Sequence, residues 1–347
     1  MGSTYGSNNS TSIENEKEVS VVWRDHEGGD CTREQLSRFL EGVSIPACYL
    51  TVGLMQGLSR PLLNVYPLAL RATEAQQVTL PTLVMLPCTF KLFFGFWSDT
   101  MPVFGKRRKY YMGFGWILTS FSMLHLLFNY NLQLPPSNGS NGGEMMIEGA
   151  PSIQVLSLSF FLFGMGFWWA DVMGDSLVAE KAKLEPLEQR GQLQTTCYAC
   201  RFFGQMVAAP CSTVIYSNFE NGPAIIVGLL AGIPLILMIP LVFFLRDDTP
   251  ATILTIQEQC SQLWNNMCSR AVWQPMAFVY LFNLLQVTNG AWRQFLKTVY
   301  DFSAEELNEL LTASYVLLYV GTLVYKYFML KWSWRSVFII SIIMNGV

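Results

Sequence analysis

The chain has 347 residues, of which 51% are apolar and only 14% are charged. Soluble chains carry roughly 25% charged residues, so this composition excludes a soluble enzyme with one core and indicates a membrane protein with several spans. The net charge of −3 gives no support for nucleic-acid binding. In a membrane protein the position of each Lys and Arg matters more than their sum.

A polar tail and a series of apolar stretches follow one another along the chain. Residues 1–42 lack the apolar core of a secretory signal, so they predict a disordered cytosolic tail. A helix needs about 20 mostly apolar residues to cross the hydrocarbon, and helices satisfy their own backbone there. The sequence therefore predicts an all-α polytopic membrane bundle. Its predicted spans are 45–67, 76–98, 110–129, 152–177, 192–216, 223–245, 271–291 and 308–329, with a ninth beginning near Arg335.

The polar stretch 246–270 divides the predicted spans into two groups. We interpret 43–245 as an N-terminal six-span bundle, 246–270 as a cytosolic linker and 271–347 as an incomplete C-terminal bundle. Two parallel six-span repeats joined in this way are typical of one class of secondary transporters. On this interpretation about nine of twelve spans are present, and we expect the sequence to be a fragment.

The basic residues predict the orientation of the spans. Sixteen of the 22 Lys and Arg residues lie in the tail and in the connectors 98–110, 178–192, 246–270 and 326–335, whereas four lie in the alternate connectors. By the positive-inside rule the first set is cytosolic, and so is the N-terminus. A glycosylation sequon at Asn138 falls in a connector predicted to be external. The sequence predicts an integral multi-pass membrane protein but leaves plasma membrane or organelle open.

Four ionisable residues lie deep inside predicted spans, where a charge is costly and therefore suggests function. Lys91, Asp171 and Arg201 each lie about 12 Å from the cytosolic ends of three different spans, at 1.5 Å per helical residue. Asp175 follows Asp171 by one turn on the same helix face. We expect these side chains to converge in one layer.

Two interpretations of this layer remain open. The charges can form an ion-paired staple that only spares the helices an unpaired charge. Alternatively, Arg201 or Lys91 attracts an anionic substrate, while Asp171 exchanges a proton or switches partners between inward-open and outward-open states.

A metal-dependent phosphotransferase is a weaker reading of the pair Asp171 and Asp175, because two carboxylates one turn apart can hold Mg²⁺. The neighbouring Phe167, Trp168 and Trp169 offer neither further acidic ligands nor a phosphate contact. We therefore predict no metal, no cofactor and no enzymatic activity.

The connector 98–110 combines an acid at a helix end, a glycine turn and a basic cluster. Positive-inside anchoring explains part of this cluster, but it does not explain Asp99. An acid that faces Arg107 and Arg108 across a tight turn can lock two helices in one state and release them in another, which predicts a cytosolic gate.

Small and polar residues within the spans predict helix contacts. Gly53-x-x-x-Gly57 and Gly228-x-x-x-Gly232 are typical of close helix packing. Amides around a central cavity could hydrogen-bond a planar ligand, and each could equally join two helices. The residues in question are Gln56, Asn64, Gln205, Asn283, Gln286 and Asn289.

Several motifs resemble those of a known transporter family. Gly95-x-x-x-Asp99 followed by Gly105-Lys106-Arg107-Arg108 resembles the signature loop of the major facilitator superfamily, with a longer spacing. Residues 86–108 resemble the second-span block of the folate-biopterin transporter family, whose loop has this longer form. Residues 52–59, 170–180 and 191–204 resemble its blocks in the first, fourth and fifth spans. The resemblance covers about residues 45–215.

This resemblance implies a twelve-span carrier in the lipid bilayer that moves folates or pterins by alternating access, with proton coupling. It places Lys91, Asp99, Arg108, Asp171, Asp175, Glu180 and Arg201 in motif positions. Glu180 thereby joins the predicted gate. Folate is a dianion with a flat ring, so Trp168, Trp169 and Gln56 are candidate contacts beside the cations. A carrier of another organic anion and a membrane scaffold without transport activity remain alternatives.

Overall fold

The computed structural model describes residues 33–134, 148–186, 191–245, 247, 255–285, 295–296, 299–302 and 304–346. Residues up to Arg38 form a unit of their own, of which only the start of the first helix is described, and the bundle discussed below begins at Phe39. The first helix begins at Arg33, inside the stretch predicted as a tail. The rest of that tail, the sequon at Asn138, Gln286 and Asn289 lie outside the described residues.

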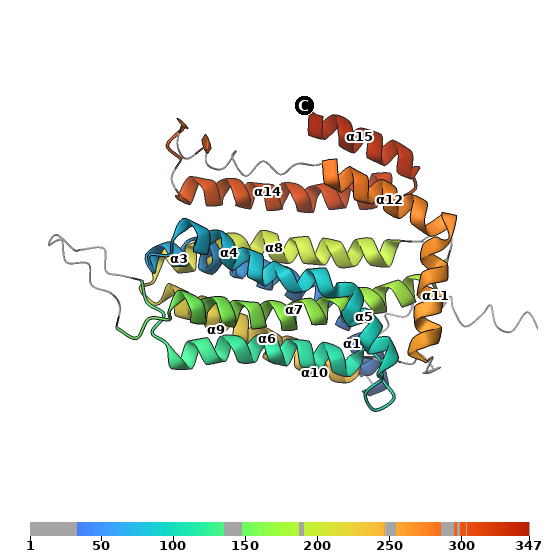
Figure 1. The fold of residues 1–347 in the computed structure, drawn as a ribbon, viewed down its shortest axis with the longest axis horizontal. Coiled ribbons are helices and arrows are strands. Elements are labelled where there is room, and N and C mark those ends of the chain that lie inside the picture. The colour runs from blue at the N-terminus through green and yellow to red at the C-terminus, as the bar shows by residue number, and fades with distance from the viewer. Residues whose placement is uncertain are drawn as a thin grey trace, which may run out of the picture. The chain divides into compact units, whose positions relative to one another are not determined.

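The regular structure in the described residues is helical, which confirms the predicted all-α fold (Figure 1). The helices are α1 (Arg33–Leu58), α2 (Arg60–Asn64), α3 (Tyr66–Ala69), α4 (Glu74–Met85), α5 (Lys91–Thr100), α6 (Lys109–Asn129), α7 (Ile153–Ala182), α8 (Gln192–Asn218), α9 (Gly222–Ile233), α10 (Ile239–Phe244), α11 (Ile256–Cys268), α12 (Arg270–Leu285), α14 (Ala304–Val324) and α15 (Trp334–Gly346). A 3₁₀ segment, Leu86–Phe90, joins α4 to α5, and π-helical segments extend α9 (Pro234–Met238) and α14 (Tyr325–Met329).

Five helical stretches within the described residues are long and apolar enough to cross a membrane. They are Glu74–Thr100, Lys109–Asn129, Ile153–Ala182, Gly222–Phe244 and Glu309–Met329. The helices α1 and α8 occupy two more of the nine predicted spans and are long enough, but they carry more polar residues. The helices α12 and α15 are shorter within the described range.

Prolines divide two of the predicted spans. The stretch 45–67 contains three helices, because Pro61 opens α2 and Pro67 opens α3. In the second span Pro87 lies at the start of the 3₁₀ segment that precedes α5. Proline has no N–H to continue an α-helical ladder, so breaks at these positions are expected. Lys91 is consequently the first residue of a new helix.

Glycines bring the helices of the six-span region together. A Cβ added at Gly53 of α1 would lie 1.9 Å from the carbonyl oxygen of Arg201, and one at Gly115 of α6 would lie 2.6 Å from that of Gly166 in α7. In contrast, a Cβ at Gly228 would meet its nearest neighbour, a side-chain atom of Leu127, at 3.8 Å. The first glycine motif therefore mediates close packing as predicted, whereas the second does not.

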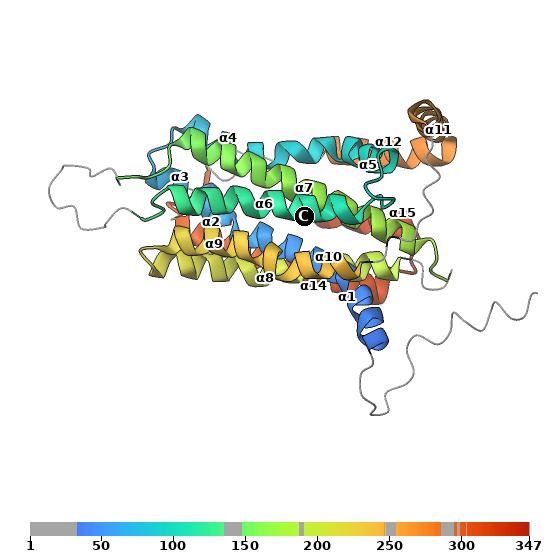
Figure 2. The same cartoon turned by 90° about the horizontal axis from the view of Figure 1, so that it is seen from below.

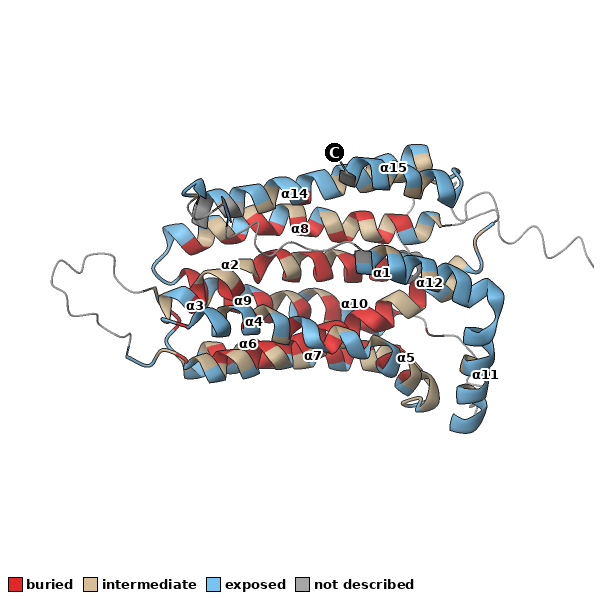
Figure 3. Cartoon of the chain, turned by 45° about the horizontal axis from the view of Figure 1, so that its top comes forward, coloured by how far each residue is buried: buried red, intermediate tan, exposed pale blue. Residues whose placement is uncertain are grey.

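The apolar core lies in the six-span region. Fully buried aromatic and aliphatic side chains come from α1, α6, α7 and α9 (Figure 3). The helix α6 packs along α7, and α14 packs against α8 (Figure 2). Most described residues of α12, α14 and α15 are exposed, with Tyr315 of α14 an exception at 6% exposure. The predicted charge layer thus lies within the best-packed part of the chain.

Candidate functional site

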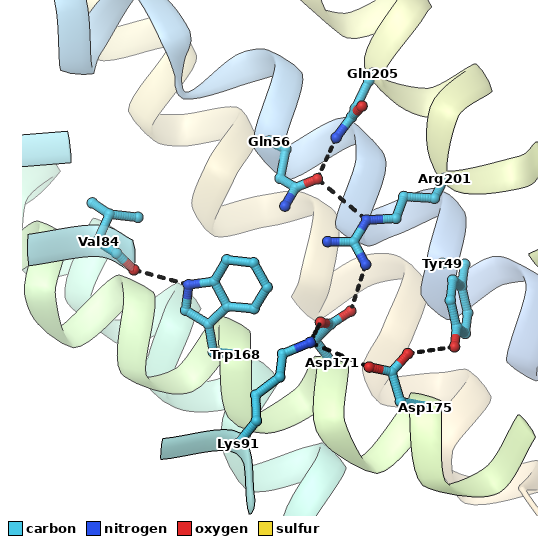
Figure 4. A network of polar contacts seen from close by, with 9 residues as sticks. All are labelled: Tyr49, Gln56, Val84, Lys91, Trp168, Asp171, Asp175, Arg201 and Gln205. Carbon is cyan, nitrogen blue, oxygen red and sulfur yellow. Dashed lines mark hydrogen bonds and ion pairs between the residues drawn. The ribbon is translucent and has the colours of Figure 1, made fainter. Parts of the chain in front are cut away.

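Asp171 of α7 is the centre of a network of charges (Figure 4). Its Oδ2 accepts a hydrogen bond from Lys91 Nζ at 2.6 Å, and its Oδ1 accepts one from Arg201 Nη1 at 3.1 Å. The residue is only 2% exposed. Three helices, α5, α7 and α8, therefore supply the three predicted charges, and the structure brings them together.

Asp175 extends the network toward α1. Lys91 Nζ also lies 3.2 Å from Asp175 Oδ2, and the Tyr49 hydroxyl donates to Asp175 Oδ1 at 2.6 Å. The side chain of Asp175 is 33% exposed, so the two acids differ sharply in burial. We call Lys91, Asp171, Asp175 and Arg201 the charge layer. With both carboxylates ionised, its formal charges cancel.

Two amides continue the network beyond Arg201. Arg201 Nε donates to Gln56 Oε1 at 3.3 Å, and Gln205 Nε2 donates to the same oxygen. Gln205 follows Arg201 by one helical turn, so both side chains leave α8 on one face. Of the polar set identified in the sequence, these two amides meet, whereas Asn283 donates to Val279 O of its own helix.

The adjacent residues Trp168 and Trp169 have different surroundings. The indole Nε1 of Trp168 donates to Val84 O at 2.9 Å, and Lys91 Nζ lies 4.9 Å from the Trp168 ring centroid. Trp169 instead stacks on Phe94, with ring centroids 4.7 Å apart. Neighbours in an α-helix point about 100° apart, so only Trp168 shares the face of Asp171.

The local sequence explains why α7 can carry this site. Trp168, Asp171 and Asp175 follow one another by three and four residues, which places them along one face. Gly174 lies beside α1, where an added Cβ would be 3.3 Å from Cys48 Sγ. Close approach of α1 brings Tyr49 within reach of Asp175. Pairing compensates the desolvation of these charges in a low dielectric.

The predicted gate residues also meet. Arg108 Nη2 lies 3.2 Å from Asp99 Oδ1, and Arg108 Nη1 forms an ion pair with Glu180 of α7. Arg107 Nη1 approaches Asp99 Oδ1 only to 4.0 Å. We call Asp99, Arg107, Arg108 and Glu180 the gate cluster. It joins the end of α5, the start of α6 and the last turns of α7.

Asp247, which follows α10, is a further member of this region that sequence reasoning did not identify. Its Oδ2 accepts from the backbone N of Arg108 at 2.8 Å, and its carbonyl oxygen accepts from Lys106 Nζ at 2.7 Å. An acid is favourable at a helix N-terminus, here that of α6. The partners are 139 residues apart along the chain, so no local pattern could have paired them.

The two aspartates of α7 are arranged as acceptors for an ammonium group. Lys91 Nζ is within hydrogen-bonding distance of both carboxylates and takes the position that a bridging cation would need. Among the described residues no group of three His, Cys, Asp or Glu could hold a metal ion. The geometry at the two aspartates is that of an ion-pair network centred on Lys91.

A cleft of about 1020 Å³ opens close to the charge layer, between the facing ends of α7 and α8 and the helices α14 and α15. Its lining includes Lys183, Gln194, Tyr198, Tyr325, Trp332 and Trp334. The Tyr198 ring packs edge-on against Tyr49, with centroids 5.6 Å apart. Because the Tyr49 hydroxyl binds Asp175, side chains connect the cleft to the charge layer.

The apolar spans, the glycine-mediated contacts and the buried charge network define a helical membrane bundle with an internal polar site. Within this class, the family model of the BT1 family matches residues 53–138 and 143–347, and the chain belongs to that family.

One curated relative is a folate-biopterin transporter of Synechocystis sp., which is 23% identical over 293 residues. The alignment covers 83% of this chain and 54% of the relative, so the chain spans about half the length of that relative. No solved structure matches the chain.

Proposed function

We propose that this protein is a secondary transporter of folates or pterins that works by alternating access and is coupled to protons. The observation that carries the proposal is the formally neutral charge layer around the buried Asp171, beside a cleft, in a chain of the BT1 family. A scaffold would gain little from charges inside a membrane bundle, because each one costs about 2.5–3.5 kcal/mol to insert.

The chemistry of the layer suits an anion that carries a flat ring. Lys91 lies over the face of Trp168, and Gln56 with Gln205 provides amide groups beside Arg201. The cleft volume of about 1020 Å³ lies at the upper end of the range for small-molecule sites, roughly 300–1,000 Å³. A folate, with its carboxylates and pterin ring, uses both kinds of group.

The two aspartates have different roles in the coupling of substrate transport to protons. Asp171 is buried and binds both cations, so it holds the helices together. Asp175 is one-third exposed and shares only Lys91, so we assign the proton to Asp175 rather than Asp171. Protonating Asp175 removes one negative charge and leaves the layer with a net charge of +1. That charge attracts an anionic substrate, so proton and anion bind together.

Other titratable and charged groups lie around Asp175 on four helices. They are Lys91 of α5, Cys48 and Tyr49 of α1, Cys197, Tyr198 and Arg201 of α8, and Asp171 of α7 itself. The Tyr49 hydroxyl donates to Asp175 Oδ1 at 2.6 Å. Tyr49→Phe therefore removes a hydrogen-bond donor from Asp175 and leaves it the contact with Lys91.

Uptake of labelled folate and labelled biopterin into a transport-deficient host tests the proposal, with membrane insertion checked in parallel. We expect saturable uptake that an inward proton gradient accelerates. Asp175→Asn fixes the neutral form, so it should abolish this acceleration while substrate exchange across the membrane persists. Tyr49→Phe is the matched variant, because it removes the hydrogen bond to Asp175 and keeps the carboxyl group, so we expect the acceleration by the proton gradient to persist. Gradient-driven uptake by Asp175→Asn would contradict the assignment of the proton.

A carrier of another organic anion is the second candidate. The cations Lys91 and Arg201 recognise carboxylates in general, and a competition panel of pterins, folates and simple dicarboxylates separates the two. Competition by dicarboxylates without competition by pterins would favour this second candidate. Unchanged activity of Arg201→Ala would instead favour a scaffold.

A further inference from the structure

The helix α11 (Ile256–Cys268) has a strongly two-sided sequence. Its apolar residues recur with the helical period and fall on one face. They are Ile256, Cys260, Leu263, Trp264 and Met267. The opposite face carries Glu258, Gln262 and Asn265. Such a helix is stable when the apolar face is covered.

The protein does not cover this face within the described residues. Ile256 is 61% exposed, Trp264 67% and Met267 45%. The axis of α11 runs across the spanning helices, at the end of the bundle near α5 and α10 (Figures 1 and 2). This end carries the 98–110 loop, which the basic residues predict to be cytosolic. A helix perpendicular to the spans lies parallel to the membrane plane.

One hydrogen bond fixes α11 beside the end of α5. Gln259 Oε1 accepts from the Thr100 hydroxyl at 2.6 Å. Gln259 and Leu263 are the half-buried residues of α11, and they lie one turn apart. Both residues lie at one border of the apolar face, and the other residues of that face are exposed beside the bundle. Along the chain, α10 precedes this position and closes the span Gly222–Phe244.

We propose that α11 lies in the headgroup region of the bilayer, with Ile256, Cys260, Leu263, Trp264 and Met267 in the acyl boundary. A span end fixes its level at the membrane surface, and its apolar face is of the kind that interfacial helices bury there. Trp264 suits this position, because its ring is apolar and its N–H can reach the headgroups. The occupant of the face is therefore lipid.

The polar face indicates which lipids α11 tolerates. Interfacial helices that select anionic lipids carry Lys and Arg, whereas the residues of α11 include neither. Its acid, Glu258, forms a capping box with Thr255, whose backbone N and hydroxyl donate at 2.9 and 2.8 Å. These hydrogen bonds lower the pKa of Glu258, so the carboxylate is charged at neutral pH. The helix should therefore gain nothing from anionic lipid.

Spin labels placed singly along 256–267, in the full chain with its other cysteines replaced, test the proposal in zwitterionic liposomes. Oxygen collides preferentially with labels in lipid, and a water-soluble nickel chelate collides with labels in water. We expect the oxygen maxima at the five apolar positions. Nickel collisions should be about fivefold more frequent for Gln262→Cys than for a label at Cys260.

Each other outcome overturns the proposal. Frequent nickel collisions at all positions would place α11 in water. Low collision rates with both reagents at the apolar positions would show that protein covers this face. Exchanging a third of the lipid for an anionic one should leave the profile unchanged, and Gln262→Lys should make it sensitive. Deeper burial of the unmodified helix in anionic lipid would contradict the assigned lipid class.

Discussion

The helix α7 carries two clusters of ion pairs in different surroundings. Arg201 and Asp171 in the charge layer are 3.1 Å apart, and Arg108 and Asp99 in the gate cluster are 3.2 Å apart. The side chain of Asp171 is 2% exposed, whereas that of Asp99 is 37% exposed. The two ion pairs have nearly equal distances but unequal energies, because solvent screens the pair in the gate cluster and hardly reaches the pair in the charge layer.

The clusters also differ in redundancy. In the gate cluster both Arg107 and Arg108 approach Asp99, so the loss of one leaves the other within about 4 Å. In the charge layer each cation has a fixed acid and each acid a fixed cation. We expect single neutralisations to be severe in the layer and graded at the gate.

Asp171→Asn should give the largest effect. It leaves Lys91 with one acid and Arg201 with none, and removing one partner of a buried pair costs about 3–5 kcal/mol of stability. Substrate uptake should fall roughly 100-fold, which is the factor that corresponds to about 3 kcal/mol. Uptake assays and thermal unfolding in detergent measure the two effects, with membrane insertion checked. Normal uptake together with reduced thermal stability would show that the layer is only a staple.

Gly53→Ala tests the packing that holds the layer in place. The new Cβ would lie 1.9 Å from Arg201 O, so α1 and α8 must separate and Arg201 must shift. Overpacking of this kind costs about 1–3 kcal/mol. Gly228→Ala is the control, since its nearest neighbour would be at 3.8 Å. Equal thermal stability of the two variants would mean that the close α1–α8 contact is not needed.

Arg108→Gln should have an intermediate effect. Arg108 binds both Asp99 and Glu180, so its loss separates the end of α5 from α7, and we expect transport to fall about tenfold. Arg107→Gln removes only the 4.0 Å contact, and transport should stay within about twofold. Transport rates at a fixed substrate concentration compare the pair. Similar losses in both variants would indicate general anchoring by the positive-inside rule.

The helical period and the depth of residues within the spans predict much of the site from the sequence. Depth within the spans brought Lys91, Asp171 and Arg201 to one level, and the structure joins them. Tyr49 was not predicted, although it precedes Gln56 by seven residues and therefore shares its face of α1. The same rule separates Trp169 from Trp168. The helix breaks follow from prolines, which a count of apolar residues ignores.

Pairings with residues between the spans were beyond reach of the sequence. Asp247 meets the backbone of Arg108 because α10 ends beside the start of α6, and this requires the packing of helices far apart in the chain. A hydropathy pattern fixes which residues enter the membrane, but not which helices become neighbours.

Trp168→Phe should have the smallest effect and still distinguish the two tryptophans. The Val84 carbonyl lies where α4 passes into the 3₁₀ segment, and in a 3₁₀ pattern its partner would be Pro87, which has no N–H. Trp168 Nε1 donates to this carbonyl at 2.9 Å, and the Trp168 ring also faces Lys91. Losing that donor costs about 1–3 kcal/mol of stability, and this cost is smaller when the freed carbonyl binds another donor. Substrate affinity and thermal stability should therefore both fall modestly.

Trp169→Phe is the control. It keeps the stacking on Phe94 and loses no hydrogen bond, because the Trp169 indole nitrogen has no partner in the described structure. Its affinity should therefore match that of the unmodified chain in a binding titration, and a larger loss for Trp169→Phe than for Trp168→Phe would place the substrate on the opposite face of α7.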